Sequence, residues 1–154
     1  MIERTLVFVK PRNEDIAQEV FDYLGELLIS DSECHARNRI KRLDFIPEAV
    51  IAEHYKDLRV FDEDIFNATM KVYKSGTMFL TDYSGPNIIQ RVRLKIGNLD
   101  PLKSEPWTIR GKFSNDSGDE ARREKRYLNN VIHASSNQEE ATRELGLWKY
   151  CLGD

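Results

Sequence analysis

Hydrophobic residues in this chain occur either in short continuous runs or at every third or fourth position. The run TLVFV at residues 5–9 is apolar and rich in β-branched side chains, which predicts a buried strand. Similar runs predict strands at residues 77–83 and 131–134. Residues 39–46, where Ile40, Leu43 and Phe45 are interspersed with polar and basic residues, predict a fourth. Helical spacing predicts the intervening elements, at residues 15–28, 47–58, 63–73, 87–96 and 137–148.

Several boundaries carry sequence signals of their own. Gly76 and Gly97 follow predicted helices, where glycine readily adopts the left-handed conformation that ends a helix. The SGP sequence at residues 84–86 predicts a turn, and Ser136 with Glu139 predicts a capping box for the last helix. The order of elements predicts an α/β (α+β) sandwich, with a ferredoxin-like four-stranded antiparallel sheet and helices packed on it.

No repeat, linker or low-complexity tract divides the chain, so residues 1–154 are expected to form a single domain. Residues 98–129 lack periodicity, and they include an extended loop at about 114–128. A long segment without regular elements is unusual inside a compact domain unless it builds a site. Function is therefore expected near this segment.

The composition excludes several classes of protein. A net charge of −3 argues against the broadly basic surface of a general nucleic-acid binder. No apolar run approaches the roughly 18 residues of a membrane span, and the N-terminus lacks signal-peptide features. Cys34 and Cys151 lie far apart, as expected for free thiols in a reducing compartment. A cytoplasmic protein is expected, with no membrane partner and no dedicated nucleic-acid site.

The chain contains three histidines, and His133 is the best candidate for a nucleophile. It ends a short apolar strand, lies two residues before Ser135 and precedes a helix N-terminus, which attracts anions. Glu144 on that helix can hold one ring nitrogen as N–H and so leave the other free to attack. His35 is expected to be a surface residue, and His54 an ordinary helical histidine.

Side chains able to bind phosphate are also present. Lys10 ends the first predicted strand, Arg93 lies on the helix before Gly97, and Arg110 lies in the TIRG motif. Together they supply the positive charge that a phosphoryl-transfer transition state requires. Neither a GxxxxGK[ST] loop nor a GxGxxG fingerprint occurs, which argues against a P-loop or Rossmann nucleotide site.

These motifs occur in a recognisable order. The stretches ERTLVFVKP, AEHY, KSG, RLKIGNLDP, TIRGKF, NVIHASS and ELGLW resemble the nucleoside diphosphate kinase family from about residue 3 to residue 148. The resemblance implies ping-pong transfer of the γ-phosphate of a nucleoside triphosphate, such as ATP, to a nucleoside diphosphate through a phosphohistidine. It also implies Mg²⁺ bound with the nucleotide phosphates, no metal site on the protein alone, and a homo-oligomer built from dimers.

The resemblance also implies roles for individual residues. The catalytic group comprises a nucleophile, its orienting carboxylate and three neighbours: His133, Glu144, Lys10, Tyr55 and Ser135. Nucleotide contacts are implied for Lys10, Arg93, Leu99, Arg110, Asn130 and Phe66. For the base-stacking residue, the register points to Ile65, with Phe61 or Phe66 as substitutes.

Some positions depart from the family pattern. Four side chains differ: Leu99 replaces a phosphate-binding threonine, Arg12 an aspartate, Ala134 a glycine and Ser136 an aspartate. The loop at 114–128 is longer than usual and brings Tyr127 and Leu128 toward the expected base position. The nucleophile, its carboxylate and both arginines are retained, so an active enzyme with altered nucleotide contacts is expected.

Two alternatives compete with this reading. Leu99 and the long loop favour a nucleotide-binding relative with weakened catalysis, acting as a sensor or scaffold. The retained His133 and Glu144 argue against it, because a pure binder needs no oriented nucleophile. The other alternative is a ferredoxin-like RNA-binding module, but neither central strand carries the clustered aromatics of such modules.

Overall fold

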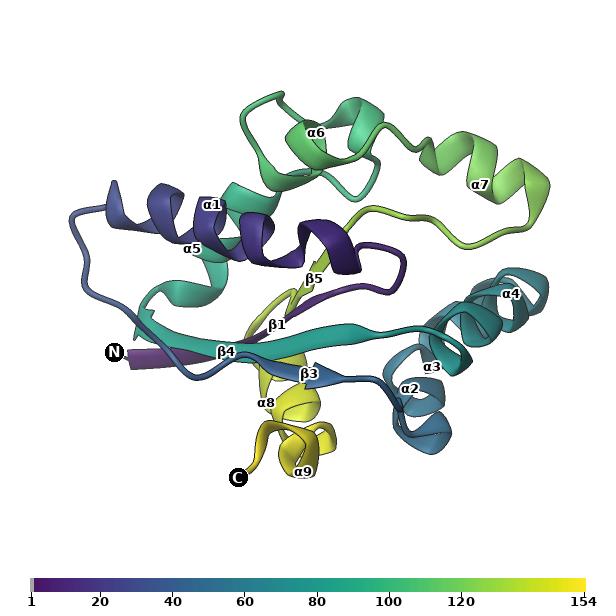
Figure 1. Ribbon diagram of the computed structural model, residues 1–154, viewed down its shortest axis with the longest axis horizontal. Helices are drawn as coiled ribbons and strands as arrows, with labels where there is room; N and C mark the ends of the chain where they lie inside the picture. The colour runs from purple at the N-terminus through teal and green to yellow at the C-terminus, as the bar shows by residue number, and fades with distance from the viewer. Residues whose placement is uncertain (1) are drawn as a thin grey trace.

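The computed structural model describes residues 2–154, in which a five-stranded antiparallel sheet separates two layers of helices (Figure 1). Strand β1 (Ile2–Val9) lies centrally, between β4 (Met78–Pro86) and β5 (Ile132–Ala134). Two short strands, β2 (Ala36–Arg37) and β3 (Lys41–Leu43), pair with the other side of β4. This strand order confirms the ferredoxin-like α/β sandwich predicted from the sequence.

Most of the remaining residues are helical. The α-helices are α1 (Ala17–Ile29), α2 (Glu48–His54), α3 (Lys56–Phe61), α4 (Glu63–Lys74), α5 (Ile88–Ile96), α6 (Ile109–Phe113), α7 (Gly118–Glu124), α8 (Gln138–Leu147) and α9 (Lys149–Leu152). Two 3-10 turns, at Glu14–Ile16 and Pro101–Lys103, precede α1 and α6. Within residues 2–154, none of these helices has the length and apolar character needed to cross a membrane.

The alternation of β1 explains why helices cover both faces of the sheet. Val7 and Val9 point into one core, which is completed by α1 and α5. Leu6 and Phe8 point into the other core, which contains Trp148 and side chains of α2 and α4. All four strand side chains are fully buried. Burial on both faces makes β1 a rigid support for its neighbour β5.

Several predicted boundaries were wrong. The second strand, predicted at 39–46, is limited to β3 at residues 41–43, while β2 at residues 36–37 lies before the predicted range. Between the two strands, the Asn38 carbonyl accepts the hydroxyl of Thr81 at 2.8 Å. The turn predicted at 84–86 is instead part of β4, which pairs as far as Pro86 with Ile2. These differences give five strands instead of four. The cap of α8 is Asn137, whose side chain accepts from the backbone N–H of Glu140, and not Ser136.

Candidate functional site

His133 lies in the middle of β5, directly opposite Phe8 of β1. The Phe8 ring stacks against the imidazole with ring centroids 4.8 Å apart and an angle of 26° between the planes. Glu144 of α8 places its Oε1 2.9 Å from the Nε2 of His133. The strand, the aromatic ring and the carboxylate therefore fix the orientation of the imidazole.

Glu144 is itself held by two neighbours and is nearly inaccessible. The Ser135 hydroxyl donates to Glu144 Oε1 at 2.8 Å, while the same hydroxyl oxygen accepts the backbone N–H of Leu6 at 3.2 Å. Burial opposes ionisation, but the hydrogen bond and charge of His133 and the bond from Ser135 outweigh it and lower the pKa of Glu144 to about 2. An ionised carboxylate only accepts hydrogen bonds.

The ionised state of Glu144 decides which ring nitrogen of His133 can react. Because Oε1 can only accept, Nε2 of His133 must carry a proton. Nδ1 then keeps the lone pair of the neutral ring, and it has no hydrogen-bond partner within residues 2–154. The arrangement predicted from the sequence, one nitrogen held as N–H and the other left free, is present in this geometry.

Lys10 lies at the end of β1 and is buried among polar groups. Its Nζ donates to the side-chain oxygen of Asn130 at 2.9 Å and to the carbonyl of Leu128 at 3.1 Å. Burial and the positive charge of Arg110 lower the pKa of Lys10 to about 7, although Asp116 acts in the opposite direction. An anion bound beside this ammonium would favour its charged form.

Arg110 is anchored entirely by backbone carbonyls. Its guanidinium donates to the carbonyls of Asn130, Gly97 and Ile132 at 3.3, 3.2 and 2.7 Å. Burial and the charge of the nearby Arg93 lower the pKa of Arg110 to about 10. These bonds hold a cation against the strand that carries His133, while Arg93 on α5 is half-buried beside it.

The backbone is strained just before β5. Val131 has φ of +73°, in the left-handed region that β-branched residues rarely occupy. Its carbonyl accepts the backbone N–H of Lys10 at 2.8 Å, which helps to keep this conformation in place. Strain of this kind persists where surrounding contacts over-determine the backbone, and it concentrates at functional sites.

A cavity of about 460 Å³ opens next to Lys10, between α3–α4 and α7. Four predicted site residues contribute to its wall: Lys10, Tyr55, Leu99 and Asn130. Phe61 and Ile65 also line it, whereas Phe66 does not: its side chain is buried, with the Arg59 guanidinium 5.3 Å from its ring. Of the three residues considered for base stacking, Phe61 and Ile65 therefore line the cavity and Phe66 does not.

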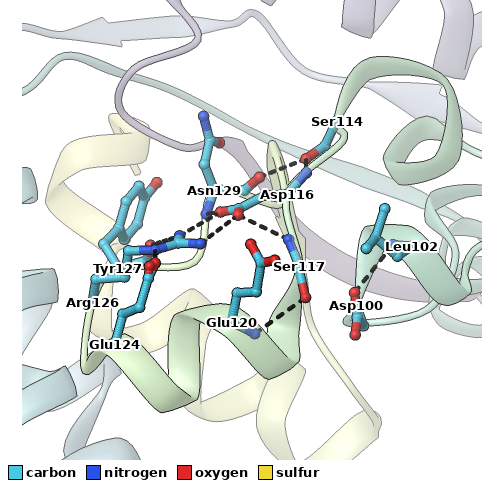
Figure 2. Close-up of polar contacts among 10 residues, drawn as sticks. All are labelled: Asp100, Leu102, Ser114, Asp116, Ser117, Glu120, Glu124, Arg126, Tyr127 and Asn129. Atoms are coloured by element: carbon cyan, nitrogen blue, oxygen red, sulfur yellow. Dashed lines mark hydrogen bonds and ion pairs between the residues drawn. The ribbon is translucent and has the colours of Figure 1, made fainter.

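The segment predicted as an extended loop at about 114–128 contains helix α7, which forms a wall of this cavity. Asp116 organises the segment, as Figure 2 shows. Its carboxylate pairs with the Arg126 guanidinium through two contacts of 2.9 Å and accepts the backbone N–H groups of Ser117 and Asn129. The Ser117 hydroxyl then caps α7 by accepting from the backbone N–H of Glu120.

Helix α7 is also tied to both sides of the cavity. Lys125, just after the helix, forms an ion pair with Asp62 at the start of α4. At the other end, Gly118 packs closely against Asp100: a Cβ here would lie 3.0 Å from the Asp100 carboxylate, so a larger residue would require that side chain to shift. The Arg122 guanidinium lies 5.9 Å from the centre of the Phe61 ring.

His54 was missed as a residue of this site. It ends α2, is buried rather than solvated, and its ring lies 4.6 Å from that of His133 at an angle of 79°. The only sequence signal was its place next to Tyr55, which itself reaches the cavity. His35, expected at the surface, is half-buried with Nδ1 3.5 Å from the Arg91 guanidinium.

Comparison with known proteins agrees with this geometry. The family profile described as nucleoside diphosphate kinase matches residues 3–149. Nucleoside diphosphate kinase A of Canis lupus familiaris is 31% identical over 146 residues, which are 95% of this chain and 85% of that protein. The nucleoside diphosphate kinase of Methanoculleus marisnigri is 31% identical over 147 residues, with 95% and 87% covered.

A solved structure gives the same result. The transition-state mimic of nucleoside-diphosphate kinase from Borrelia burgdorferi, with bound vanadate and ADP, superposes with a TM-score of 0.81. The two sequences are 29% identical, and the match covers 96% of this chain and 86% of that one.

Proposed function

The chain belongs to the nucleoside diphosphate kinase family, and we propose that His133 carries the phosphoryl group in its transfer between nucleotides. The enzyme is thus a phosphotransferase that moves the γ-phosphate of a nucleoside triphosphate to a nucleoside diphosphate. The observation that supports His133 most directly is its hydrogen bond to the ionised Glu144, which leaves Nδ1 as the free nucleophile.

The proposed reaction has two symmetrical steps. Nδ1 of His133 attacks the γ-phosphorus, a nitrogen–phosphorus bond forms, and the bond to the bridging oxygen breaks to release a nucleoside diphosphate. The terminal phosphate oxygen of a second diphosphate then attacks the phosphohistidine and breaks the nitrogen–phosphorus bond. Glu144 stabilises the positive charge that the ring gains in each step, through the bond to Nε2.

The cations near His133 are proposed to stabilise the transferred group. Lys10 and Arg110 are both bonded to Asn130, two residues before β5, and Arg93 lies close to Arg110. Charge spreads over the equatorial oxygens of the phosphoryl group in the transition state, and fixed cations lower its energy. Three of the five N–H donors of Arg110 are bonded to backbone carbonyls, and these bonds fix its positive charge in place.

The nucleotide is proposed to lie in the cavity with its phosphates toward Lys10 and its base toward Phe61 and α7. The charged and amide groups Lys10 and Asn130 support the first assignment. Leu58, Phe61 and Ile65, which form an apolar wall facing Ala121, support the second. The Borrelia relative binds vanadate and ADP, which supports a nucleotide as the ligand of this chain.

Mg²⁺ is proposed to bind together with the nucleotide phosphates. The carboxylates that line the cavity are Asp100 and Asp119. Asp100 already caps the turn at Leu102, and both carboxylates lie within 4 Å of Lys103. Mg²⁺ commonly keeps several waters and binds substrate phosphates with few protein ligands, so the proposed metal arrives with the nucleotide and needs no dedicated carboxylate site. We likewise propose that the protein is cytoplasmic and forms a homo-oligomer built from dimers, as the family resemblance implies. Light scattering on the purified protein measures the size of this oligomer.

Labelling with γ-³²P-ATP tests the proposed nucleophile. The wild-type protein should form an acid-labile, alkali-stable phosphoprotein that loses its label when a nucleoside diphosphate is added. His133→Ala should abolish both the label and nucleotide transfer, whereas the half-buried His35→Ala variant serves as a matched control. A stable label in His133→Ala would overturn the assignment. A wild-type protein that binds ADP but takes no label would support the alternative of a sensor or scaffold.

A further inference from the structure

A hydrogen bond in the core fixes the protonation of His54. The indole Nε1 of Trp148 donates to the Nδ1 of His54 at 3.0 Å, and both residues are buried. The indole N–H can only donate a hydrogen bond, so Nδ1 of His54 must present a lone pair. A neutral His54 then carries its single proton on Nε2.

His54 and His133 occupy one pocket and share their neighbours. Their ring centroids are 4.6 Å apart, and the Phe8 ring contacts both, at 5.3 Å from His54 and 4.8 Å from His133. Trp148 closes the pocket behind them, with its ring 5.7 Å from that of Phe8. Two imidazoles in such close contact would ordinarily offer competing lone pairs for a proton, a metal ion or a phosphoryl group.

We propose that Trp148 locks His54 as the neutral Nε2–H tautomer, which leaves Nδ1 of His133 as the one uncommitted imidazole lone pair of this pair. In this arrangement Glu144 accepts from the Nε2–H of His133, and Trp148 donates to the Nδ1 of His54. His54 thus acts as a positioning residue beside His133, and it is itself held by the indole N–H of Trp148. The catalytic meaning of this inference rests on the proposed function, whereas the tautomer itself does not.

The charges around His54 favour the same state. Burial lowers the pKa of His54 well below its ordinary value, and the charges of His133, Arg143 and Lys10 act in the same direction. Glu144 opposes them, yet its carboxylate oxygen is already bonded to His133 and Ser135. Protonating His54 would also break the bond from Trp148, because both ring nitrogens would then be donors.

The fixed tautomer of His54 also explains why these residues do not readily bind a transition metal. His54, His133 and Glu144 offer potential ligand atoms that all lie within 4.8 Å of one another. Zn²⁺ binds imidazole nitrogen and carboxylate oxygen readily, but each nitrogen must supply a lone pair. In His54, Nδ1 is covered by the indole and Nε2 bears the proton, so the third ligand is missing.

Nitrogen-15 NMR of the histidine side chains tests the tautomer in the unmodified protein. We expect His54 to show an unprotonated Nδ1 and a protonated Nε2 between pH 6 and 8. Observation of an Nδ1–H tautomer or an imidazolium in this range would overturn the proposal. The measurement needs neither activity nor a variant, so loss of phosphotransfer would count against the proposed function while leaving this inference standing.

Trp148→Phe tests the cause of the lock. This variant lacks the indole N–H, so His54 should populate the second tautomer. Zn²⁺ should then bind more tightly, by on the order of tenfold or more, as measured by competition with a chelator. Trp107→Phe, which changes the half-exposed second tryptophan, is the matched control and should leave both readouts unchanged. A folded Trp148→Phe protein with the wild-type His54 spectrum and Zn²⁺ affinity would overturn the assigned role of Trp148.

Discussion

Glu144 places its Oε1 2.9 Å from Nε2 of His133, and the same oxygen receives the hydroxyl of Ser135 at 2.8 Å. A single carboxylate oxygen thus orients the imidazole and is itself oriented by a serine anchored to β1 through the backbone of Leu6. The orientation of His133 therefore depends on two successive contacts with buried residues: its own bond to Glu144, and the bond of Ser135 to Glu144.

Glu144→Gln should separate charge from geometry in this arrangement. The amide oxygen can still accept from His133, but it cannot stabilise the positive charge that develops on the ring during transfer. We expect phosphorylation in a single turnover to slow by roughly 100-fold, as when a fixed electrostatic contact is removed from a transition state. Rapid-quench labelling measures the rate, and Glu139→Gln, an exposed change on the same helix, should have no effect. An unchanged rate in Glu144→Gln would show that orientation alone matters.

The parts of this site that follow local sequence rules could be predicted from the sequence. His133, Ser135 and Glu144 are linked by a strand and the helix that follows it, so spacing alone brought them together. The helix end at Gly97 was also predicted, and it is confirmed by a φ of +94° at that residue. Glycine adopts this conformation far more easily than other residues, so a glycine at this position in the sequence predicts the end of a helix.

Contacts between distant segments could not be predicted in the same way. His54 joins the site because Trp148 reaches it across 94 positions of the chain, and no periodicity reveals such a bond. Helix α7 was predicted as loop because Ala121 is its one buried residue, which leaves no apolar stripe. Its stability comes from polar contacts of Asp116 and Ser117 instead.

Lys10 should take up a proton when nucleotide binds. Burial and Arg110 lower its pKa to about 7, so at pH 8 most of the free protein carries neutral Lys10. Phosphate oxygens nearby would favour the charged form and draw in up to about one proton. Calorimetry of ADP binding in two buffers with different ionisation heats measures this uptake. Lys10→Met should abolish it, and equal uptake in that variant would assign the proton to another group.

The same pKa sets a trend in stability. Between about pH 7 and the ordinary lysine pKa of 10.5, the unfolded chain binds more protons at Lys10 than the folded protein does. The contribution of Lys10 to the free energy of unfolding should therefore rise with pH across this window. Lys10→Met should remove that rise, as chemical denaturation at pH 7 and pH 9 would show.

The Asp116–Arg126 pair should control the mobility of α7. Asp116→Asn weakens the two contacts to Arg126, and we expect the local opening free energy of α7 to fall by roughly 1.5–3 kcal/mol. Hydrogen exchange of the amides at residues 118–124 measures this change. Glu124→Gln is the matched control, because Glu124 contacts Arg126 only at the exposed surface. Unchanged exchange in Asp116→Asn would mean that the ion pair with Lys125 holds the helix instead.

Acid should reproduce the effect of Asp116→Asn. Burial opposes ionisation of Asp116, but Arg126 and the backbone N–H groups of Asn129 and Ser117 lower its pKa below the ordinary value of 3.8. Its stabilising contribution is then complete above about pH 4 and lost as the pH falls through the lowered pKa. Protection of the amides at residues 118–124, relative to their intrinsic exchange rate at each pH, should fall in acid in the wild-type protein, and less so in Asp116→Asn.

The contact between Arg122 and Phe61 should help to bind the base of the nucleotide rather than its phosphates. The guanidinium lies 5.9 Å from the ring centre, and both side chains line the cavity. If the base enters here, Arg122 can lie over it, and an exposed cation–π contact contributes about 0.5–1 kcal/mol. Arg122→Ala should therefore weaken ADP binding by roughly two- to fivefold but leave the affinity for inorganic tripolyphosphate unchanged.

The matched control is Arg123→Ala. Arg123 is also exposed but does not line the cavity, so its loss should affect the binding of neither ligand. Equal losses for ADP and tripolyphosphate in Arg122→Ala would instead make Arg122 a phosphate contact and reverse the orientation proposed for the nucleotide.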